Sequence, residues 1–173
     1  MNGDGFQEIA ISAQAITPPG NPSKIVMVSL KPPGVSAFGG GCPADSGLIP
    51  RIGAHPFAIP GGAINFHVSN TAIGRCAGLA LGVSNTSYGA IALPWFPFPA
   101  SGPLCSLLVS LDMFANGRTH TASNQMGAAS YTLDIPALSS LSGATFYAQW
   151  AVDNAIGWVP PLAMTRGLQI TIQ

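Results

Sequence analysis

Hydrophobic and polar residues alternate with a period of two in three stretches of the chain. Ile64, Phe66 and Val68 are separated by polar residues, and the same alternation recurs over residues 130–135 and 168–173. Because successive side chains of a strand point to opposite faces of a sheet, this pattern predicts strands with one buried face. The side chains that we expect these strands to bury are Phe66, Val68, Leu133, Ile135, Ile170 and Ile172.

Five other stretches carry apolar residues on both faces, as strands inside a sandwich do. They are residues 9–13, 24–30, 76–83, 104–111 and 145–152. Glycine- and proline-rich sequences that favour turns separate the expected strands, at 18–22, 60–62, 116–117 and 160–161. Together these signals predict an all-β fold, an antiparallel β-sandwich of jelly-roll or immunoglobulin-like type with about nine strands.

Helix has little room in this sequence. Residues 136–141 read as one helical turn, with Pro136 at the first position and Gly143 just beyond the end.

The composition is unusually poor in charge. Only 7% of the 173 residues are charged, against about 25% in a typical soluble domain. A neutral surface repels its own copies weakly, so self-association is compatible with it, and the lack of a basic stripe argues against nucleic acid. No apolar run approaches the roughly 20 residues of a membrane helix, so we expect no membrane span. The N-terminus also lacks the pattern of a signal peptide, so a signal for secretion is expected upstream of this sequence.

Three cysteines, Cys42, Cys76 and Cys105, allow one disulfide in three possible pairings and leave one thiol. A zinc site is disfavoured, because no CxxC spacing occurs and the three histidines are scattered singly.

The first residues, NGDGFQE at positions 2–8, resemble the end of an FG-GAP repeat, the calcium-loop unit of integrin-like β-propellers. The resemblance implies a remnant of such a repeat and a linker strand over residues 1–37, and an upstream propeller domain as a partner. It also implies calcium ligands at Asn2, Asp4, the Phe6 carbonyl and Glu8. The first aspartate of the loop would fall before Met1, so we expect no working calcium site and no other cofactor.

The sequence from residue 38 onward resembles a β-rich module that closes many large secreted bacterial proteins. The residues that carry this resemblance are FGGGCP at 38–43, PRIG at 50–53, LALGVSN at 79–85, LCSLLVS at 104–110 and TFYAQW at 145–150. The resemblance implies a second unit over residues 38–173 and cysteines at the positions of Cys42 and Cys105. We therefore expect a disulfide between these two and a buried thiol at Cys76.

Candidate catalytic groups are sparse. No nucleophile elbow occurs, and Asp45, Asp112, Asp134 and Asp153 lie far apart in sequence. The densest polar group is Asp112 with Arg118 and His120, which we interpret as a hairpin end tied by a surface ion pair.

The remaining conspicuous side chains read as structural. Trp150 lies in an apolar strand and is expected in the core. His67 is expected on a solvated strand face, and His55 is expected in a loop.

Three aromatic residues, Trp95, Phe96 and Phe98, stand among prolines that prevent a regular central strand. They form either a contact surface for a ligand, which Trp158 would join, or a loop that seals one end of the sandwich.

The sequence is most consistent with a noncatalytic extracellular module that serves attachment, export, or ligand or glycan binding of a larger secreted protein. Two alternatives stay open: a self-assembling subunit of a surface layer or filament, and a hydrolase domain with an unrecognised site.

Overall fold

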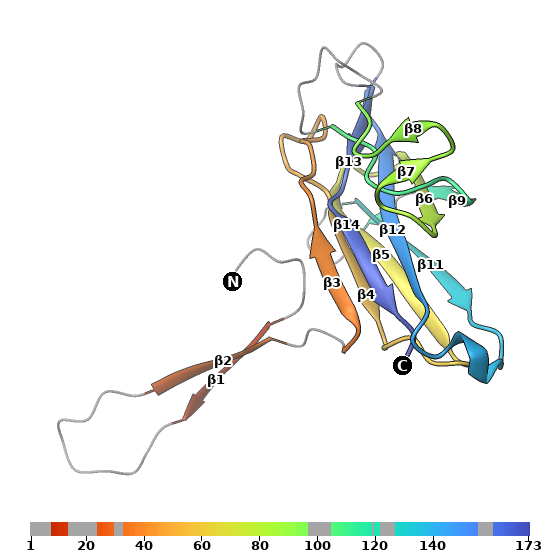
Figure 1. The fold of residues 1–173 in the computed structure, drawn as a ribbon. Coiled ribbons are helices and arrows are strands. Elements are labelled where there is room, and N and C mark those ends of the chain that lie inside the picture. Colours follow the sequence, from red (N-terminus) through yellow and green to blue (C-terminus); the bar gives the residue numbers. More distant parts are fainter. Residues whose placement is uncertain are drawn as a thin grey trace, which may run out of the picture.

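A computed structural model describes residues 8–13, 24–29, 33–96, 105–118, 120–121, 127–155 and 161–173. These residues form an all-β fold of antiparallel strands, as the alternating pattern predicts. Its two larger sheets pack as the layers of a β-sandwich (Figure 1).

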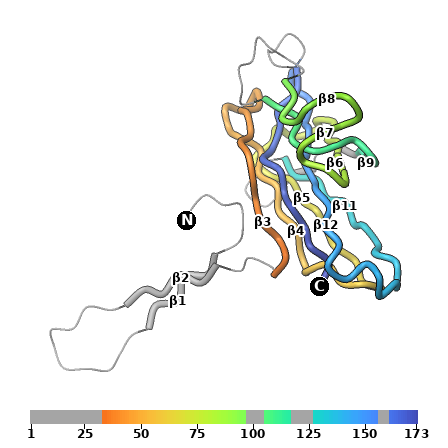
Figure 2. The backbone as a smooth tube through the Cα atoms, viewed as in Figure 1, coloured from red at the N-terminus to blue at the C-terminus, as the bar shows by residue number. Residues whose placement is uncertain are grey.

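The larger sheet has six strands. Its order is β3 (Val35–Phe38), β14 (Gly167–Thr171), β12 (Thr145–Asp153), β6 (Cys76–Gly82) and β9 (Met113–Arg118), with β13 (Leu162–Met164) paired to the second half of β12. Figure 2 shows that the first strand of the sandwich, β3, lies beside the last, β14. The sandwich thus includes Val35, and the expected boundary between residues 37 and 38 falls inside β3.

The smaller sheet has four strands. Its order is β10 (His120–Thr121), β11 (Gly127–Asp134), β5 (Ala63–Thr71) and β4 (Arg51–His55). Two separate hairpins pair β1 (Glu8–Ala13) with β2 (Lys24–Ser29) and β7 (Ser87–Tyr88) with β8 (Ile91–Ala92). A 3-10 turn, η2 (Ser139–Leu141), lies within the expected helical turn.

The core lies between the two larger sheets and confirms the alternation. Phe66, Val68 and Ile170 are fully buried, and Ile135 and Ile172 are nearly so. Leu133 is only partly buried, although it packs against the same cluster. Trp150 is 2% exposed and belongs to this core, as expected.

Two local predictions are wrong. The expected strand over 104–111 is absent from its described part, residues 105–111, where Leu107 makes one isolated bridge to Trp95. The expected turn at Asn116 and Gly117 lies inside β9, where these residues pair with Gly78 and Ala77. In both places contacts with residues far away in the sequence override the local signal.

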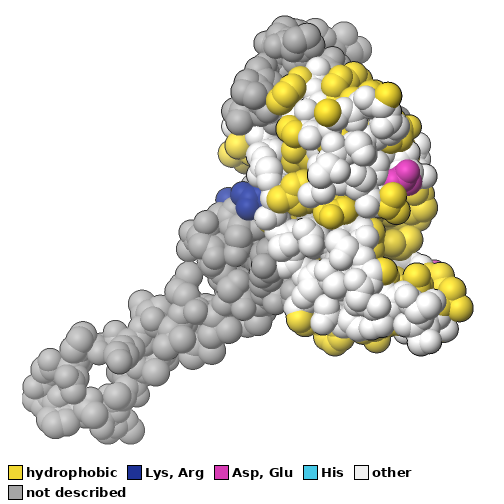
Figure 3. Space-filling view, viewed as in Figure 1, with side chains coloured by type: hydrophobic (Ala, Val, Ile, Leu, Met, Phe, Trp, Pro, Cys, Tyr) yellow, Lys and Arg dark blue, Asp and Glu magenta, His cyan; other side chains and the backbone are white. Residues whose placement is uncertain are grey.

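The surface carries few charges, as the composition requires. In Figure 3, isolated charged groups stand among hydrophobic and neutral polar atoms on the described part of the face shown. Among the described residues, no helix is long and apolar enough to cross a membrane.

Candidate functional site

An apolar pocket of about 410 Å³ lies on the outer face of the six-stranded sheet. Its floor is formed by the outward positions of two neighbouring strands, Gly78 and Ala80 on β6 and Ala151 on β12. The alternate residues of these strands, such as Leu79 and Trp150, point into the core. The pocket exists because the outward positions carry small side chains where the inward ones carry large ones.

An irregular segment forms one side of the pocket. Residues 105–110, called the covering segment here, cross the outer face of the sheet, and Leu107 lines the pocket. Leu108 and Val109 pack on Ala80, Phe38 and Tyr147. The segment thus adds a partial third layer to the sandwich.

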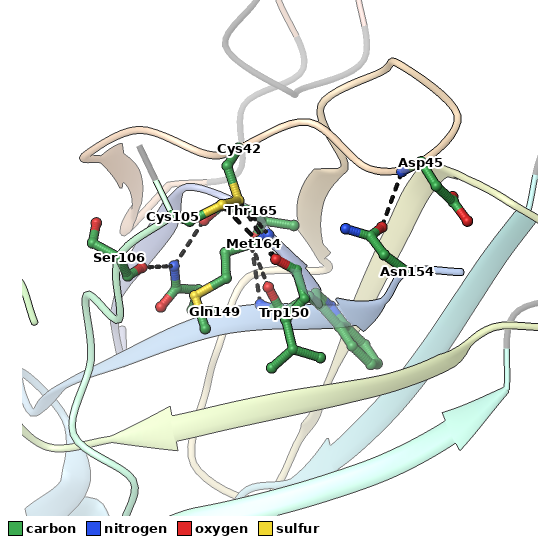
Figure 4. The surroundings of a disulfide bond; sticks show 10 residues. Cys42, Asp45, Cys105, Ser106, Gln149, Trp150, Asn154, Met164 and Thr165 are labelled. Carbon is green, nitrogen blue, oxygen red and sulfur yellow. Dashed lines mark hydrogen bonds between the residues drawn. A yellow bond between two sulfur atoms is a disulfide. The ribbon is translucent and has the colours of Figure 1, made fainter. Parts of the chain in front are cut away.

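Gln149 holds the covering segment by its side chain. Its Nε2 donates to the carbonyls of Ser106 at 2.9 Å and Thr165 at 2.8 Å, and its Oε1 accepts from the Leu108 amide at 2.9 Å. Gln149 is 1% exposed, so these bonds replace the water that its amide loses on burial. Figure 4 shows Gln149 reaching from β12 to Ser106 beside the disulfide.

The disulfide joins Cys42 to Cys105, with the two Cα atoms 4.9 Å apart. This confirms the expected pairing. Both half-cystines are buried, and Met164 and Ala151 pack against them. The disulfide therefore fixes Cys105, the first residue of the covering segment, against two residues of the pocket lining, Met164 and Ala151.

Cys76 corrects the expectation of a buried thiol. It is free and exposed, because it is the first residue of β6 and lines the mouth of the pocket rather than the core.

Aromatic side chains form the exposed part of the pocket wall. Trp95 is 42% exposed, and its backbone bonds to Leu107 in both directions, at 3.0 and 2.8 Å. Phe114, on β9, is 58% exposed and lies across Gly78, so closely that a side chain at Gly78 would collide with its ring. Phe96 is 40% exposed but is not among the residues that line the pocket. Of the two described residues of the expected aromatic contact surface, Trp95 lines the pocket and Phe96 does not.

The end of β12 supplies the acidic side chain of the pocket. Asp153 lines it, and the Oδ1 atom of Asp153 is buried without a hydrogen-bond partner. Nearby, Arg75 forms an ion pair with Asp45, which also accepts a 2.9 Å bond from the Ala155 amide. The Asp45 amide in turn donates to the side-chain oxygen of Asn154 at 3.0 Å (Figure 4).

The expected polar group around Asp112 is arranged differently. Its carboxylate accepts hydrogen bonds from the Ser110 hydroxyl at 2.6 Å and the Val83 amide at 2.8 Å. The bond from Ser110, and then that from Val83, lower the pKa of Asp112. Asp112 therefore anchors the end of the covering segment to the end of β6 and flanks no hairpin turn. The side chains of Arg118 and His120 lie outside the described part of the structure.

His67 lies on the outer face of the smaller sheet, as expected, where it is half-buried and packs over Gly53. His55 corrects the expectation of a loop residue, because it is the last residue of β4. Their ring centroids are 5.5 Å apart. Burial, and then repulsion from His55, lower the pKa of His67.

Several expected site residues lie outside the described residues. They are Asn2, Asp4 and Phe6 of the calcium loop, and the aromatic residues Phe98 and Trp158. Glu8 begins β1, but its side chain is likewise not described. The described residues contain no group of three or more potential metal ligands from histidine, cysteine or carboxylate side chains.

Sequence reasoning missed the floor of the pocket and Phe114, and it named Asp153 only as one of four scattered carboxylates. A signal for the floor was present: in residues 78–81, Gly78 and Ala80 alternate with Leu79 and Leu81, which places small residues on one face and large ones on the other. Nothing local marks Phe114, because its place in the wall depends on pairing between β9 and β6.

No known protein family's sequence model matches the chain, and searches of curated proteins and of solved structures also found no match.

Proposed function

We propose that this chain is a noncatalytic binding module of a larger secreted protein, and that its ligand enters the pocket on the outer face of the six-stranded sheet. The observation that carries the proposal is the cavity of about 410 Å³ with Trp95 and Phe114 in its wall. Cavities of this size and apolar character are typical of small-ligand sites.

The chemistry of the lining supports binding rather than catalysis. Most of the lining side chains are apolar, and the amide of Gln149 already uses its hydrogen bonds within the protein. Such a wall holds a ligand by burying apolar surface. A glycan would need a denser set of polar partners, so we favour a small apolar ligand.

An extracellular setting is supported by the disulfide, since such bonds persist in oxidising compartments. The role as a module of a larger protein, downstream of a propeller, rests on the sequence resemblance alone.

The pocket can be tested with N-phenyl-1-naphthylamine, an uncharged dye that fluoresces when it enters an apolar site. We expect saturable binding to the wild-type protein. Trp95→Ala and Phe114→Ala should each weaken it at least fivefold without lowering the melting temperature by more than a few degrees, because both side chains are substantially exposed.

The matched control is Phe57→Ala. Phe57 is 45% exposed and does not line the pocket, so the same substitution there should leave dye binding unchanged. Absence of saturable binding, or equal losses in Phe57→Ala and Phe114→Ala, would contradict the proposal. A Trp95→Ala protein that is unfolded would instead show that Trp95 seals the fold.

Self-association is a second candidate, favoured by the apolar side chains on the outer strand β9. Met113 and Phe114 are 39% and 58% exposed there, and β9 ends the sheet order. Exposed edge strands pair readily with further chains. Light scattering at rising concentration should then show oligomers that Met113→Lys disperses, and a monomer at all concentrations would exclude this candidate.

A further inference from the structure

The pocket lining includes a carboxylate, Asp153, that no described residue pairs. Asp153 Oδ1 has no hydrogen-bond partner, although the other side of the residue reaches solvent. A buried acceptor without a partner is costly, and a charged one more so. The part of the Asp153 carboxylate that reaches solvent lines the pocket, so a donor on a ligand can pair with it there.

The position of Asp153 directs its side chain to the cavity. On β12, Gln149, Ala151 and Asp153 alternate with the core residues Trp150 and Val152, and all three of the former line the pocket. Asp153 thus stands at one end of an otherwise apolar row.

The charge of Asp153 is not balanced by the described residues of the lining. Asp153 is the only lysine, arginine, aspartate or glutamate among them. The neighbouring cation Arg75 is engaged by Asp45. The electrostatic complement of the described pocket is therefore a single positive charge attached to an apolar body.

We propose, building on the proposed function, that the ligand is a small apolar amine. Its ammonium group pairs with the Asp153 carboxylate, and its hydrocarbon or aryl body lies over Ala151, against Trp95 and Phe114. An ammonium donor forms a charge-assisted hydrogen bond, which is stronger than a neutral one. An alkylamine is protonated at neutral pH, as the lysine side chain is.

Three probes with one carbon skeleton test this proposal: 4-phenylbutylamine, 4-phenylbutanol and 4-phenylbutyrate. Their affinities can be measured by NMR titration, which also detects weak binding. We expect the amine to bind at least tenfold more tightly than the alcohol, and the carboxylate to bind most weakly, since it meets Asp153 with a like charge.

Asp153→Asn should reduce the amine to the affinity of the alcohol and leave the alcohol unchanged. The matched control is Asp134→Asn, on the exposed end of β11 in the other sheet, which should change neither affinity.

The outcomes separate the two proposals. Equal binding of amine and alcohol to the wild-type protein, or an amine preference that survives in Asp153→Asn, overturns the amine proposal and leaves an apolar binding pocket. Tightest binding of the carboxylate also overturns it. If none of the three probes binds and the dye does not bind either, the proposed function fails as well.

Discussion

Replacement of Gln149 by methionine perturbs the attachment of the covering segment to the sheet. Methionine has a similar length and fits a buried apolar site, but it lacks the amide. The substitution therefore leaves three backbone groups without their partners: the Leu108 amide and the carbonyls of Ser106 and Thr165.

The size of the effect follows from the burial of these groups. Leu108, Ser106 and Thr165 are 6%, 4% and 0% exposed, so water does not readily replace the lost bonds. Each unsatisfied buried group costs about 1–3 kcal/mol, and the more favourable burial of methionine offsets part of the sum. We expect a loss of about 3–5 kcal/mol in the free energy of unfolding, or a fall of roughly 10 °C in melting temperature for a domain of this size.

Urea unfolding followed by circular dichroism measures this loss. The matched control is Gln169→Met on β14, where the side chain is half-exposed and the change should cost less than about 1 kcal/mol. If Gln149→Met loses no more stability than Gln169→Met, the argument that this amide fastens the covering segment is refuted.

Three other predictions concern the core, the cysteines and the outer face of the smaller sheet. Phe66→Ser should cost more than about 3 kcal/mol in unfolding free energy, while Asn65→Ser on the opposite face should cost less than about 1 kcal/mol; similar urea midpoints would contradict the burial pattern. Reduction of the disulfide, which spans 63 residues, should cost about 4 kcal/mol, and a thiol-specific reagent should titrate Cys76 alone in the folded oxidised protein. The pKa of His67 is lower in the folded protein than in the unfolded chain, so below about pH 6.5 the unfolded chain binds more protons than the folded one. The free energy of unfolding should therefore decline as pH falls through that range, and His67→Gln should flatten the decline. An unchanged pH profile in His67→Gln would count against this role of His67.

The parts of the fold that the sequence predicted are those determined by local alternation. Phe66 and Val68 lie between polar residues, and the period of two is sufficient to place them inside. The pairing of Cys42 with Cys105, in contrast, was implied by a family resemblance, since spacing alone allowed three pairings.

The prediction of a strand at 104–111 failed for a reason that lies elsewhere in the chain. Leu107, Leu108 and Val109 are as apolar as a buried strand, but the Leu108 amide and the Ser106 carbonyl bond to the side chain of Gln149, 41 residues beyond Leu108. The backbone of Leu107 bonds to Trp95 and not to a strand of either large sheet. The pocket depends on the same long-range arrangement. No local pattern can reveal that an apolar run lies on top of a sheet rather than within it.

The covering segment differs from the strands in how it is held, and this gives the pocket two parts of unequal local stability. The floor belongs to a continuous ladder of paired strands, whereas the wall at Leu107 depends on one side-chain amide, one bridge to Trp95 and a covalent tether at Cys105. Opening of the wall requires fewer bonds to break than separation of β6 from its two neighbouring strands, β12 and β9. Amide hydrogens of residues 106–109 should thus exchange with solvent sooner than those of β6 and β12, so that one wall of the pocket opens while the sandwich beneath it stays intact.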